Sequence, residues 1–554
     1  MFPTEFNSFA EMFAFPYAII PLVASAAIAA LLTLASSRFL LIAQQTGYKP
    51  DRLSRRYKTS GAGYKNRLML LSLMSFLSFC LVAACFIPAV GEGASSLVGF
   101  STFILFLALY IKTEAGVAAK LPLKKTGRLI RLSVTLFFVA FVLCLFICFV
   151  ADSIAFLIKS DILAVLRFSI LTFTPMLLPY AVIVSEAINK PSEDFRNARF
   201  VKKAKETLKK SSAVKIGITG SFGKTGVKEL LKSMLSVSNK VIATPDSFNT
   251  PLGIALTVKN GADADFFIAE MGAKNKGDIK ELCDVVMPSV GVLTGVNSQH
   301  LESFGNEETI KKTKFELFEN LCGDKIAIFS SDNDGAKELY GKFVGDKYSA
   351  GINGTFVRAE NVSLSAEGST FDLCIKGEKS VRIETELLGR HNVSNICLAA
   401  AAAYKLGASV GDIKAGAFNS KPVPHRLSTI KAAGGGIIID DAYNSSEDGA
   451  VAALETLSEF GGKKTVITPG LVELGERQEL ANENLGKLIS EVADEVVLVG
   501  KTNTDALKKG LSGGRIAEEN VKTADTLKAA VELLGGVKDG EVCLFLNDLP
   551  DEYD

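Results

Sequence analysis

This sequence of 554 residues lacks paired cysteines and lacks an excess of either charge. Its nine cysteines are scattered and none forms a C-x-x-C pair, which argues against a zinc ribbon or a disulfide framework and favours reduced thiols in a cytoplasmic setting. Charged residues make up 22% of the chain, close to the average of soluble proteins, which excludes a disordered or collagen-like chain. A chain of this length is expected to fold into about three or four domains.

The small net charge of +1 conceals two very different parts. Residues 1–210 hold 24 Lys and Arg against 11 Asp and Glu, whereas the remainder holds 37 against 49. All five long apolar runs also lie in the first part. This pattern predicts a membrane segment followed by an acidic, enzyme-sized soluble segment. We expect no nucleic-acid binding, because the soluble part is acidic.

Each of the five apolar runs is long enough to cross about 30 Å of hydrocarbon as a helix. Residues 1–37 contain no Lys or Arg, whereas the loops 44–67 and 112–131 are basic. Because basic loops stay on the cytoplasmic side, this alternation places the N-terminus outside and the C-terminal part in the cytoplasm. We therefore expect a multi-pass α-helical domain of the plasma membrane over 1–190, in contact with membrane lipids. Its predicted spans are 15–37, 68–90, 96–112, 130–151 and 162–186.

The predicted spans are nearly free of ionisable residues. Only Arg167 lies well inside one of them, so an anchor or a platform for a lipid substrate is favoured over a transporter. The basic segment 191–212 that follows has two interpretations. It is either an amphipathic helix on the anionic cytoplasmic leaflet or a solvated linker helix.

From Ala213 onward, short β-rich runs alternate with amphipathic helices, which is typical of α/β layers. The predicted strand Val214–Thr219 runs directly into Gly-Ser-Phe-Gly-Lys-Thr at 220–225, and a helix over Val227–Leu235 follows. A glycine-rich loop between a strand and a helix can bind phosphate through its backbone N–H groups and the dipole of the helix.

This loop contains the residue types that a phosphate site requires. Lys224 supplies a positive charge and the Thr225 hydroxyl suits Mg²⁺. The strict P-loop spacing is not met, because Ile218 occupies the position of the first glycine, and an ordinary glycine turn is the alternative. The residues expected to contact nucleotide here are Gly220, Ser221, Gly223, Lys224 and Thr225.

The segment Gly217-Ile-Thr-Gly-Ser-Phe-Gly-Lys-Thr225 resembles the ATP loop of the Mur ligase family, the ATP-dependent amide-forming enzymes of peptidoglycan precursor synthesis. Val227-Lys228-Glu229, which comes next, is similar to the branch that adds D-alanyl-D-alanine. The resemblance continues in order along 213–490, through segments that begin at Phe248, Glu270, Thr294, Gly389 and Asp440.

This resemblance implies a fold and a reaction. The fold would be a P-loop-type Mur ligase central ATPase domain over 213–420 and a Rossmann-like C-terminal domain over 421–554. The reaction would join a carboxylate to an amine through an acyl phosphate, with release of ADP, as in the acid–amino-acid ligases of class EC 6.3.2. Phosphorylation makes the carboxylate a better electrophile, and the protein has to position the groups and neutralise charge.

The resemblance also implies four catalytic residues: Lys224, Glu270, His300 and Lys314. Three of them would join Thr225 in holding two Mg²⁺ ions, namely Glu270, His300 and a carbamylated Lys314. Glu270 follows the apolar strand Phe266–Ala269, which places a hard oxygen ligand at a strand end. Lys314 matches the lysine that CO₂ carbamylates in the family. A free ammonium beside two divalent ions would be electrostatically costly.

Four further residues are implied in binding ATP. Asn392 and Asn395 would contact adenine, Arg426 the phosphates and Asp441 the ribose hydroxyls. ATP would then lie between two domains whose closure assembles the site. A capping or turn carboxylate is the alternative for Asp441. His391 and His425, the other two histidines, are as readily structural.

The chain departs from the family on the side of the acceptor substrate. Members begin with a soluble domain that binds UDP, whereas here the apolar segment takes its place. Ser446-Glu447 stands where the branch has Asn-Pro, Thr468–Gly475 matches its motif only in part, and Leu546–Asp551 replaces its C-terminal motif. Our hypothesis is a carboxylate-bearing cell-wall precursor that is lipid-linked or presented at the membrane. A soluble UDP-linked muramoyl peptide is the competing substrate.

The expected function is a membrane-anchored ligase that adds an amino acid or a dipeptide such as D-Ala-D-Ala to that precursor. Two alternatives stay open at this point. One is a ligase of the polyglutamate-capsule type. The other is a non-catalytic nucleotide-binding membrane scaffold, which would be expected to lack Lys224, Glu270, His300 or Lys314, and all four are present.

Overall fold

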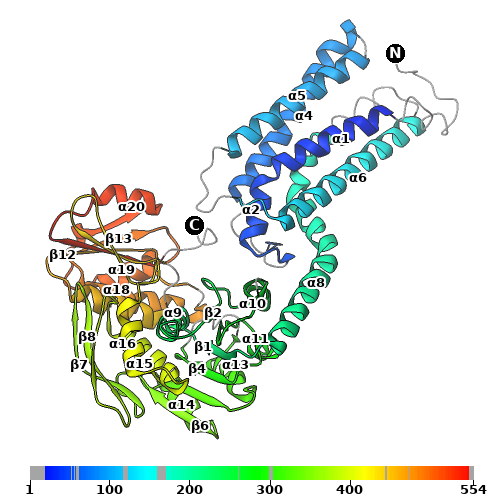
Figure 1. The fold of residues 1–554 in the computed structure, drawn as a ribbon. Coiled ribbons are helices and arrows are strands. Elements are labelled where there is room, and N and C mark those ends of the chain that lie inside the picture. The colour runs from blue at the N-terminus through cyan, green and yellow to red at the C-terminus, as the bar shows by residue number, and fades with distance from the viewer. Residues whose placement is uncertain are drawn as a thin grey trace. The chain divides into compact units, whose positions relative to one another are not determined.

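The computed structural model divides the chain into two compact units, residues 1–196 and 197–554. Figure 1 shows the helices and strands of both units. The residues that the structure describes are 19–50, 53–54, 57, 62–90, 92–115, 123–158, 170–259, 261–297, 304–442, 446–472 and 474–547.

The regular secondary structure described for the first unit consists of helices. Helix α1 packs against α6, and α4 packs against α5. Their shared core includes Ile28, Leu32, Phe39, Leu107 and Leu136. Helix α8 is continuous across the boundary of the units, although it contains Pro191. The elements are α1 (Ile19–Ala35), α2 (Ser37–Gln45), α4 (Ala62–Val90), α5 (Glu92–Ala115), α6 (Gly127–Ile158), η2 (Thr174–Leu177) and α8 (Leu178–Lys210).

Of the five expected membrane spans, one or two are found among the described residues. One helix there, Gly127–Val150, is long and apolar enough to cross a membrane. A second candidate is the pair Leu22–Ala35 and Ser37–Gln45, which is bent by 50°. At this bend the Ser36 hydroxyl donates to the carbonyl of Thr33 at 2.6 Å, a local contact that an apolar run does not reveal. The described apolar parts of α4 and α5 are Arg67–Leu81 and Ser101–Thr113.

The predicted fifth span lies partly outside the described residues, because 159–169, with Arg167, are not among them. Its described end forms η2 and the first turns of α8. The basic segment 191–212 is largely the second half of the same α8, so it does not begin a separate helix.

The second unit contains two sheets, and the first has nine strands in the order β2-β3-β1-β4-β5-β6-β7-β8-β9. Strands from β2 to β7 pair in parallel, and β7, β8 and β9 form an antiparallel meander. The bounds are β1 (Val214–Thr219), β2 (Val241–Ala243), β3 (Phe266–Glu270), β4 (Val290–Leu293), β5 (Ile326–Ser330), β6 (Asp346–Ala350), β7 (Val357–Ser365), β8 (Gly368–Ile375) and β9 (Val381–Thr385).

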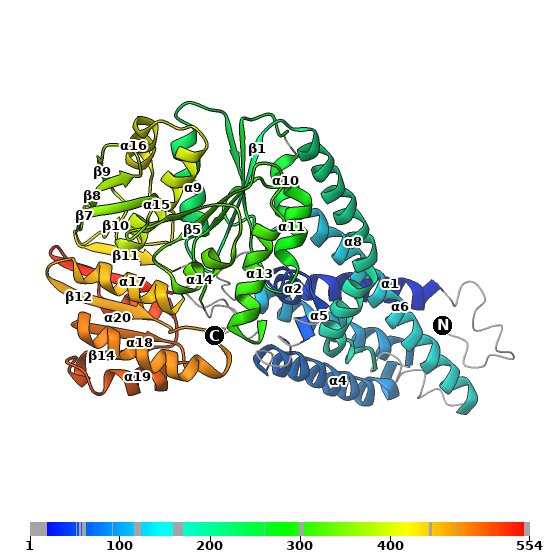
Figure 2. The ribbon, with the colours of Figure 1, turned by 90° about the horizontal axis from the view of Figure 1, so that it is seen from below.

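Helices cover both faces of this sheet, as Figure 2 shows. Ile216 and Ile218 of β1 belong to the core under α9, α15 and α16, whereas Phe267 and Ala269 of β3 belong to the core under α10, α11, α13 and α14. Alternate residues of a strand face opposite sides, so both faces of a central strand are apolar. These helices are α9 (Lys224–Leu235), α10 (Pro251–Val258), α11 (Asp278–Val286), α13 (Glu307–Glu319), α14 (Asp334–Lys342), α15 (Arg390–Lys405) and α16 (Val410–Asn419).

The second sheet has six strands in the order β10-β11-β15-β12-β13-β14. Only β10 runs antiparallel to its neighbour. This confirms the expected α/β architecture of the C-terminal part. The elements are β10 (Ser428–Lys431), β11 (Ile437–Asp441), α17 (Glu447–Ser458), β12 (Lys463–Thr468), η3 (Gly475–Arg477), α18 (Gln478–Val492), β13 (Glu495–Val499), α19 (Thr504–Leu511), η4 (Glu518–Asn520), β14 (Val521–Ala524), α20 (Leu527–Leu534) and β15 (Glu541–Leu546).

Candidate active site

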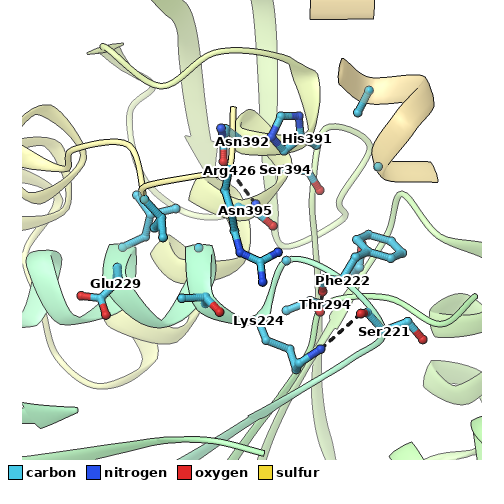
Figure 3. Close-up of a pocket in the computed structure, with 18 of the residues that line it drawn as sticks. Ser221, Phe222, Lys224, Glu229, Thr294, His391, Asn392, Ser394, Asn395 and Arg426 are labelled. Atoms are coloured by element: carbon cyan, nitrogen blue, oxygen red, sulfur yellow. Dashed lines mark hydrogen bonds between the residues drawn. The ribbon is translucent and has the colours of Figure 1, made fainter. Parts of the chain in front are cut away.

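A cavity of about 1780 Å³ lies in the second unit, where the loops after β1, β4 and β5 meet residues of the C-terminal sheet. Carboxyl ends of parallel strands are where α/β sheets bind ligands. The cavity gathers most of the predicted site, and Figure 3 shows Ser221, Lys224, Asn392, Asn395 and Arg426 within it. Its lining includes Ser221, Gly223, Lys224, Thr225, Glu270, Asn392, Asn395, Arg426 and Asp441.

The loop between β1 and α9 has room only for glycine at two positions. Gly223 has a φ of +73°, and a Cβ there would lie 2.8 Å from Oδ1 of Asn395. Gly220 has a φ of +153°, and a Cβ there would overlap the Thr294 hydroxyl. Both the backbone conformation and the close approach therefore require glycine, as in loops that bring backbone N–H groups to a phosphate.

Hydrogen bonds attach this loop to the segment after β4. The N–H of Ser221 donates to the carbonyl of Gly295 at 2.8 Å, and the N–H of Asn297 donates to the Ser221 hydroxyl at 3.1 Å. The Thr294 hydroxyl donates to the carbonyl of Phe222. The loop is thus held in shape by its neighbours, which favours a preformed anion site.

Lys224 begins α9, and its side chain folds back along the loop. Its Nζ donates to the carbonyls of Gly220 at 2.7 Å and Ser221 at 3.2 Å. Burial lowers the pKa of Lys224 to about 8, an effect that Glu270 opposes and Arg426 reinforces. Figure 3 shows the Arg426 side chain pointing toward this loop. Two cations therefore converge on one small region, which suits a ligand with several negative charges.

Glu270 ends β3 and is 1% exposed. Its Oε2 accepts a hydrogen bond from the Thr225 hydroxyl at 2.9 Å, and its Oε1 accepts one from Nδ2 of Asn249 at 3.2 Å. A carboxylate and a hydroxyl oxygen side by side are the hard donors that Mg²⁺ prefers. Thr225 and Glu270 therefore fit the ion expected here.

The remaining predicted metal ligands are His300 and Lys314. His300 lies outside the described residues. Lys314, on α13, is 3% exposed, and it is absent from the residues that line the cavity. Burial and the neighbouring charge of Lys224 lower the pKa of Lys314 to about 7. Among the described residues, no group of three His, Cys, Asp or Glu side chains is arranged to hold a metal ion.

The two asparagines expected at adenine lie on the first turns of α15, opposite the glycine loop. Asn395 packs against the loop, and its Nδ2 donates to Oδ1 of Asn392 at 3.4 Å. Asn392 donates in turn to the carbonyl of Leu388 at 2.9 Å. Their neighbour His391 has a buried Nδ1, and burial lowers its pKa to about 4, so this ring is neutral near pH 7.

Arg426 stands between two residues with a left-handed backbone, His425 at φ +61° and Leu427 at φ +48°. Such conformations are rare outside glycine and gather at functional sites. His425 Nδ1 lies 2.8 Å from Oδ2 of Asp440, and the N–H of Leu427 donates to Oδ1 of Asp441 at 3.3 Å. Burial raises the pKa of Asp441 to about 7 against the lowering effects of Arg426 and of this hydrogen bond.

Two parts of the site were not predicted from the sequence. Asp332, after β5, lines the cavity, where its Oδ2 accepts the Ser394 hydroxyl at 2.6 Å and the N–H of Ile352 at 2.6 Å. Ser-Ser-Asp-Asn-Asp directly after an apolar strand was the available signal. Lys228 was noted only as part of a motif, although its Nζ lies 3.7 Å from Oε2 of Glu270.

Comparison with protein families gives two matches within the second unit. Residues 218–403 match the Mur ligase middle domain, and 425–546 match the Mur ligase, glutamate ligase domain. Together these two segments cover the glycine loop, Glu270, Arg426 and Asp441.

Three similar proteins are all UDP-N-acetylmuramoyl-tripeptide–D-alanyl-D-alanine ligases. The Escherichia coli protein is 30% identical over 297 residues, which are 52% of this chain and 64% of that protein. The Bacillus subtilis protein is 32% identical over 54% of this chain and 65% of its own length. The Mycobacterium leprae protein is 31% identical over 59% of this chain and 70% of its own. The chain thus spans somewhat less than two thirds of the length of the E. coli and B. subtilis relatives.

Solved structures agree with these matches. MurF from Acinetobacter baumannii superposes with a TM-score of 0.57 at 25% identity, over 63% of this chain and 77% of that one. MurF ligase from Thermotoga maritima, in complex with ADP, superposes with a TM-score of 0.56 at 26% identity, over 64% of this chain and 80% of that one.

Proposed function

This chain belongs to the Mur ligase family of acid–amino-acid ligases, and on that premise we propose that it forms an amide bond with ATP through an acyl phosphate. The observation that carries the proposal is the group made by Lys224, Thr225, Glu270 and Arg426 in one cavity. This group combines three features: a glycine loop shaped for phosphate, a pair of oxygen donors suited to Mg²⁺, and a second cationic side chain, that of Arg426.

Each of these residues would serve the transfer of the γ-phosphoryl group to a carboxylate. The loop N–H groups, Lys224 and Arg426 would hold the phosphates and stabilise the charge that develops during transfer. Thr225 and Glu270 would hold Mg²⁺, which supplies charge neutralisation when bound. The amine would then attack the acyl phosphate and displace inorganic phosphate, which forms the amide bond.

His300 and a carbamylated Lys314 are proposed to complete a second Mg²⁺ site. Carbamylation requires the neutral amine, and the lowered pKa of Lys314 means that a large fraction is neutral near pH 7. Burial of the ammonium beside Lys224 favours a modification that reverses its charge. Asn392 and Asn395 are proposed at the adenine and Asp441 at the ribose, all on the wall of the same cavity.

The proposed substrates are a cell-wall precursor with a free carboxylate and an amino acid or a dipeptide such as D-Ala-D-Ala. The names of the E. coli, B. subtilis and M. leprae relatives support a peptidoglycan precursor. The Mur ligase matches begin only at residue 218, and a helical unit precedes them. We propose that the precursor is lipid-linked or presented at a membrane, with the soluble UDP-linked form as the competing substrate.

A membrane anchor in the helical unit belongs to this proposal. Only 22% of the apolar window of the candidate span Gly127–Val150 is buried within the structure, which supports an anchor more than the covered core helix of a soluble domain. The exposed residues of this helix are large and apolar, and they include Val134, Phe138, Val142 and Phe146. We propose a cytoplasmic position for the ligase unit, which the basic segments of the sequence support.

The direct test is release of phosphate from ATP by the full chain in detergent, with a panel of amino acids and dipeptides and with UDP-linked or lipid-linked precursors. We expect release that requires both an acceptor and an amine, and its loss in Lys224→Ala. Release with every precursor absent would indicate a simple ATPase. Turnover of the UDP-linked precursor alone would exclude the lipid-linked substrate.

A further inference from the structure

Lys228 lies one helical turn after Lys224 on α9, and its side chain is fully buried. It is not among the residues that line the cavity. A buried ammonium is costly unless hydrogen bonds and charges compensate it. A lysine in this position therefore requires partners, and the partners identify its role.

Three groups from three different elements surround the ammonium. Its Nζ donates to the backbone carbonyl of Asp246 and lies 3.2 Å from Oε1 of Glu229 and 3.7 Å from Oε2 of Glu270. Asp246 belongs to the loop after β2, Glu229 to α9 and Glu270 to the end of β3. Lys228 thus links the phosphate helix to the proposed metal carboxylate and to the loop 244–249.

That loop encloses Glu270. At its start, the Thr244 hydroxyl accepts the N–H of Glu270 at 3.1 Å, and at its end Nδ2 of Asn249 donates to Oε1 at 3.2 Å. Midway, Asp246 has a φ of +45°, a left-handed conformation that is unfavourable outside glycine. The Lys228 hydrogen bond is made to the carbonyl of this residue, so it stabilises the turn that closes the loop around the carboxylate.

We propose that Lys228 is a positioning residue that holds Glu270 and the loop 244–249 ready for the Mg²⁺ of a bound nucleotide. Asp246, Ser247 and Asn249 also line the cavity, so the same lysine couples the metal side of the site to the wall on which this loop lies. This inference rests on the proposed function, because it assumes that Glu270 binds the ion that accompanies the nucleotide.

A role of Lys228 as a charge and a role in positioning Glu270 predict opposite effects of its removal on Mg²⁺ binding. If the ammonium acted mainly as a charge, its loss would relieve repulsion and strengthen Mg²⁺ binding. If it acts by positioning, its loss frees the carboxylate and the loop and weakens Mg²⁺ binding. Loss of groups that orient metal ligands typically weakens metal affinity by about 10–100-fold.

The experiment compares the full-length wild type in detergent with Lys228→Met, which keeps a similar volume and removes the charge. Lys240→Met is the matched control, because Lys240 is 62% exposed and pairs with Asp263 on the surface at 2.5 Å. ADP affinity is measured by calorimetry in EDTA and in Mg²⁺, and hydrogen exchange is followed in 244–249. We expect Lys228→Met to reduce the Mg²⁺-dependent gain in ADP affinity about tenfold or more and to speed exchange in the loop, with the control unchanged.

The outcomes separate this inference from the proposed function. If the ADP affinity of the wild type does not depend on Mg²⁺, the proposed function itself is contradicted. A Mg²⁺-dependent wild type with an unchanged or larger gain in Lys228→Met would overturn the positioning role alone. Should Lys228→Met fail to fold, Asn249→Ala breaks the loop's contact with Oε1 without removing a buried charge. An unaltered Mg²⁺-dependent gain in that variant would equally overturn the proposal.

Discussion

Lys224 is the residue whose ionisation should control nucleotide binding. Its pKa of about 8 means that the ammonium is lost as the pH rises through 8, and the phosphates bind only the charged form. We therefore predict that ADP affinity in EDTA falls about tenfold between pH 7 and pH 9. Calorimetric titration across this range is the measurement. Lys224→Arg keeps its charge and should show a flat profile, and a flat profile in the wild type would contradict the prediction.

Asp441 should make the stability of the fold, rather than nucleotide affinity, depend on pH. Its folded pKa of about 7 lies above the ordinary value of 3.8, so the carboxyl stabilises the fold fully below pH 3.8 and this contribution is lost as the pH rises to 7. Asp441→Asn has no ionisable carboxyl at this position, so its stability does not fall in this way as the pH rises. Its melting temperature relative to wild type should therefore rise from pH 5 to pH 7.5, by roughly 2–4 °C for each kcal/mol.

The same variant tests the proposed ribose contact. A carboxylate that accepts ribose hydroxyls contributes about 1.5–3 kcal/mol, so Asp441→Asn should bind ADP at least about tenfold more weakly at pH 8. A variant that is more stable but binds ADP normally would leave Asp441 a purely structural residue.

At the level of single residues, the sequence was informative wherever a motif lay on one continuous segment. Ser221, Gly223, Lys224 and Thr225 were predicted together and lie together in the cavity. Lys228 and Asp332 were missed as site residues, because their roles depend on partners far along the chain, at Glu270 and Ser394. Such contacts arise from the strand order, which no local pattern contains.

Helices α9 and α16 meet through a glycine, and their packing sets the position of the phosphate helix. A Cβ at Gly416 would lie 2.6 Å from the backbone N of Met234, and the Ser233 hydroxyl donates to the Gly416 carbonyl at 2.8 Å. Gly416→Ala should therefore push the helices apart and destabilise the protein by about 1–3 kcal/mol. Because α9 begins at Lys224, ADP affinity should fall as well.

Gly411 provides the control on the same helix. Its Cβ would meet only the Ser409 hydroxyl, at 3.5 Å, so Gly411→Ala should stabilise the helix by about 0.5–1 kcal/mol. Urea denaturation of both variants is the measurement. Equal effects of the two substitutions would show that helix propensity, and not the contact between α9 and α16, determines the result.

Elements of the second unit were more predictable than those of the first. The strand Val214–Thr219 was predicted with its observed bounds, since its apolar residues lie between a turn and a glycine loop. The helical unit was only partly predictable, because the length and apolarity of a run do not show where a helix bends, as at Ser36, or where it continues, as in α8 through Pro191. Both features depend on local hydrogen bonds and packing.

For the whole molecule, the open question is whether the helical unit places the ligase at a membrane. Residues 134, 138, 142 and 146 of α6 recur every four positions and form an apolar stripe with 50–62% exposure. Exposure of this apolar stripe to water would cost considerable free energy, whereas lipid would bury it. We predict that the full chain stays with membranes after washing with alkaline carbonate.

The stripe can be tested by adding charge to it. Phe138→Asp together with Val142→Asp places two carboxylates near the middle of Gly127–Val150, and each costs about 2.5–3.5 kcal/mol on insertion. The double variant should leave the membrane fraction, whereas Val344→Asp, at a residue of the ligase unit that is 93% exposed, should remain. A wild type found in the supernatant would refute the anchor. A double variant that sediments with the wild type would instead assign the anchor to another part of the chain, such as the bent pair Leu22–Gln45.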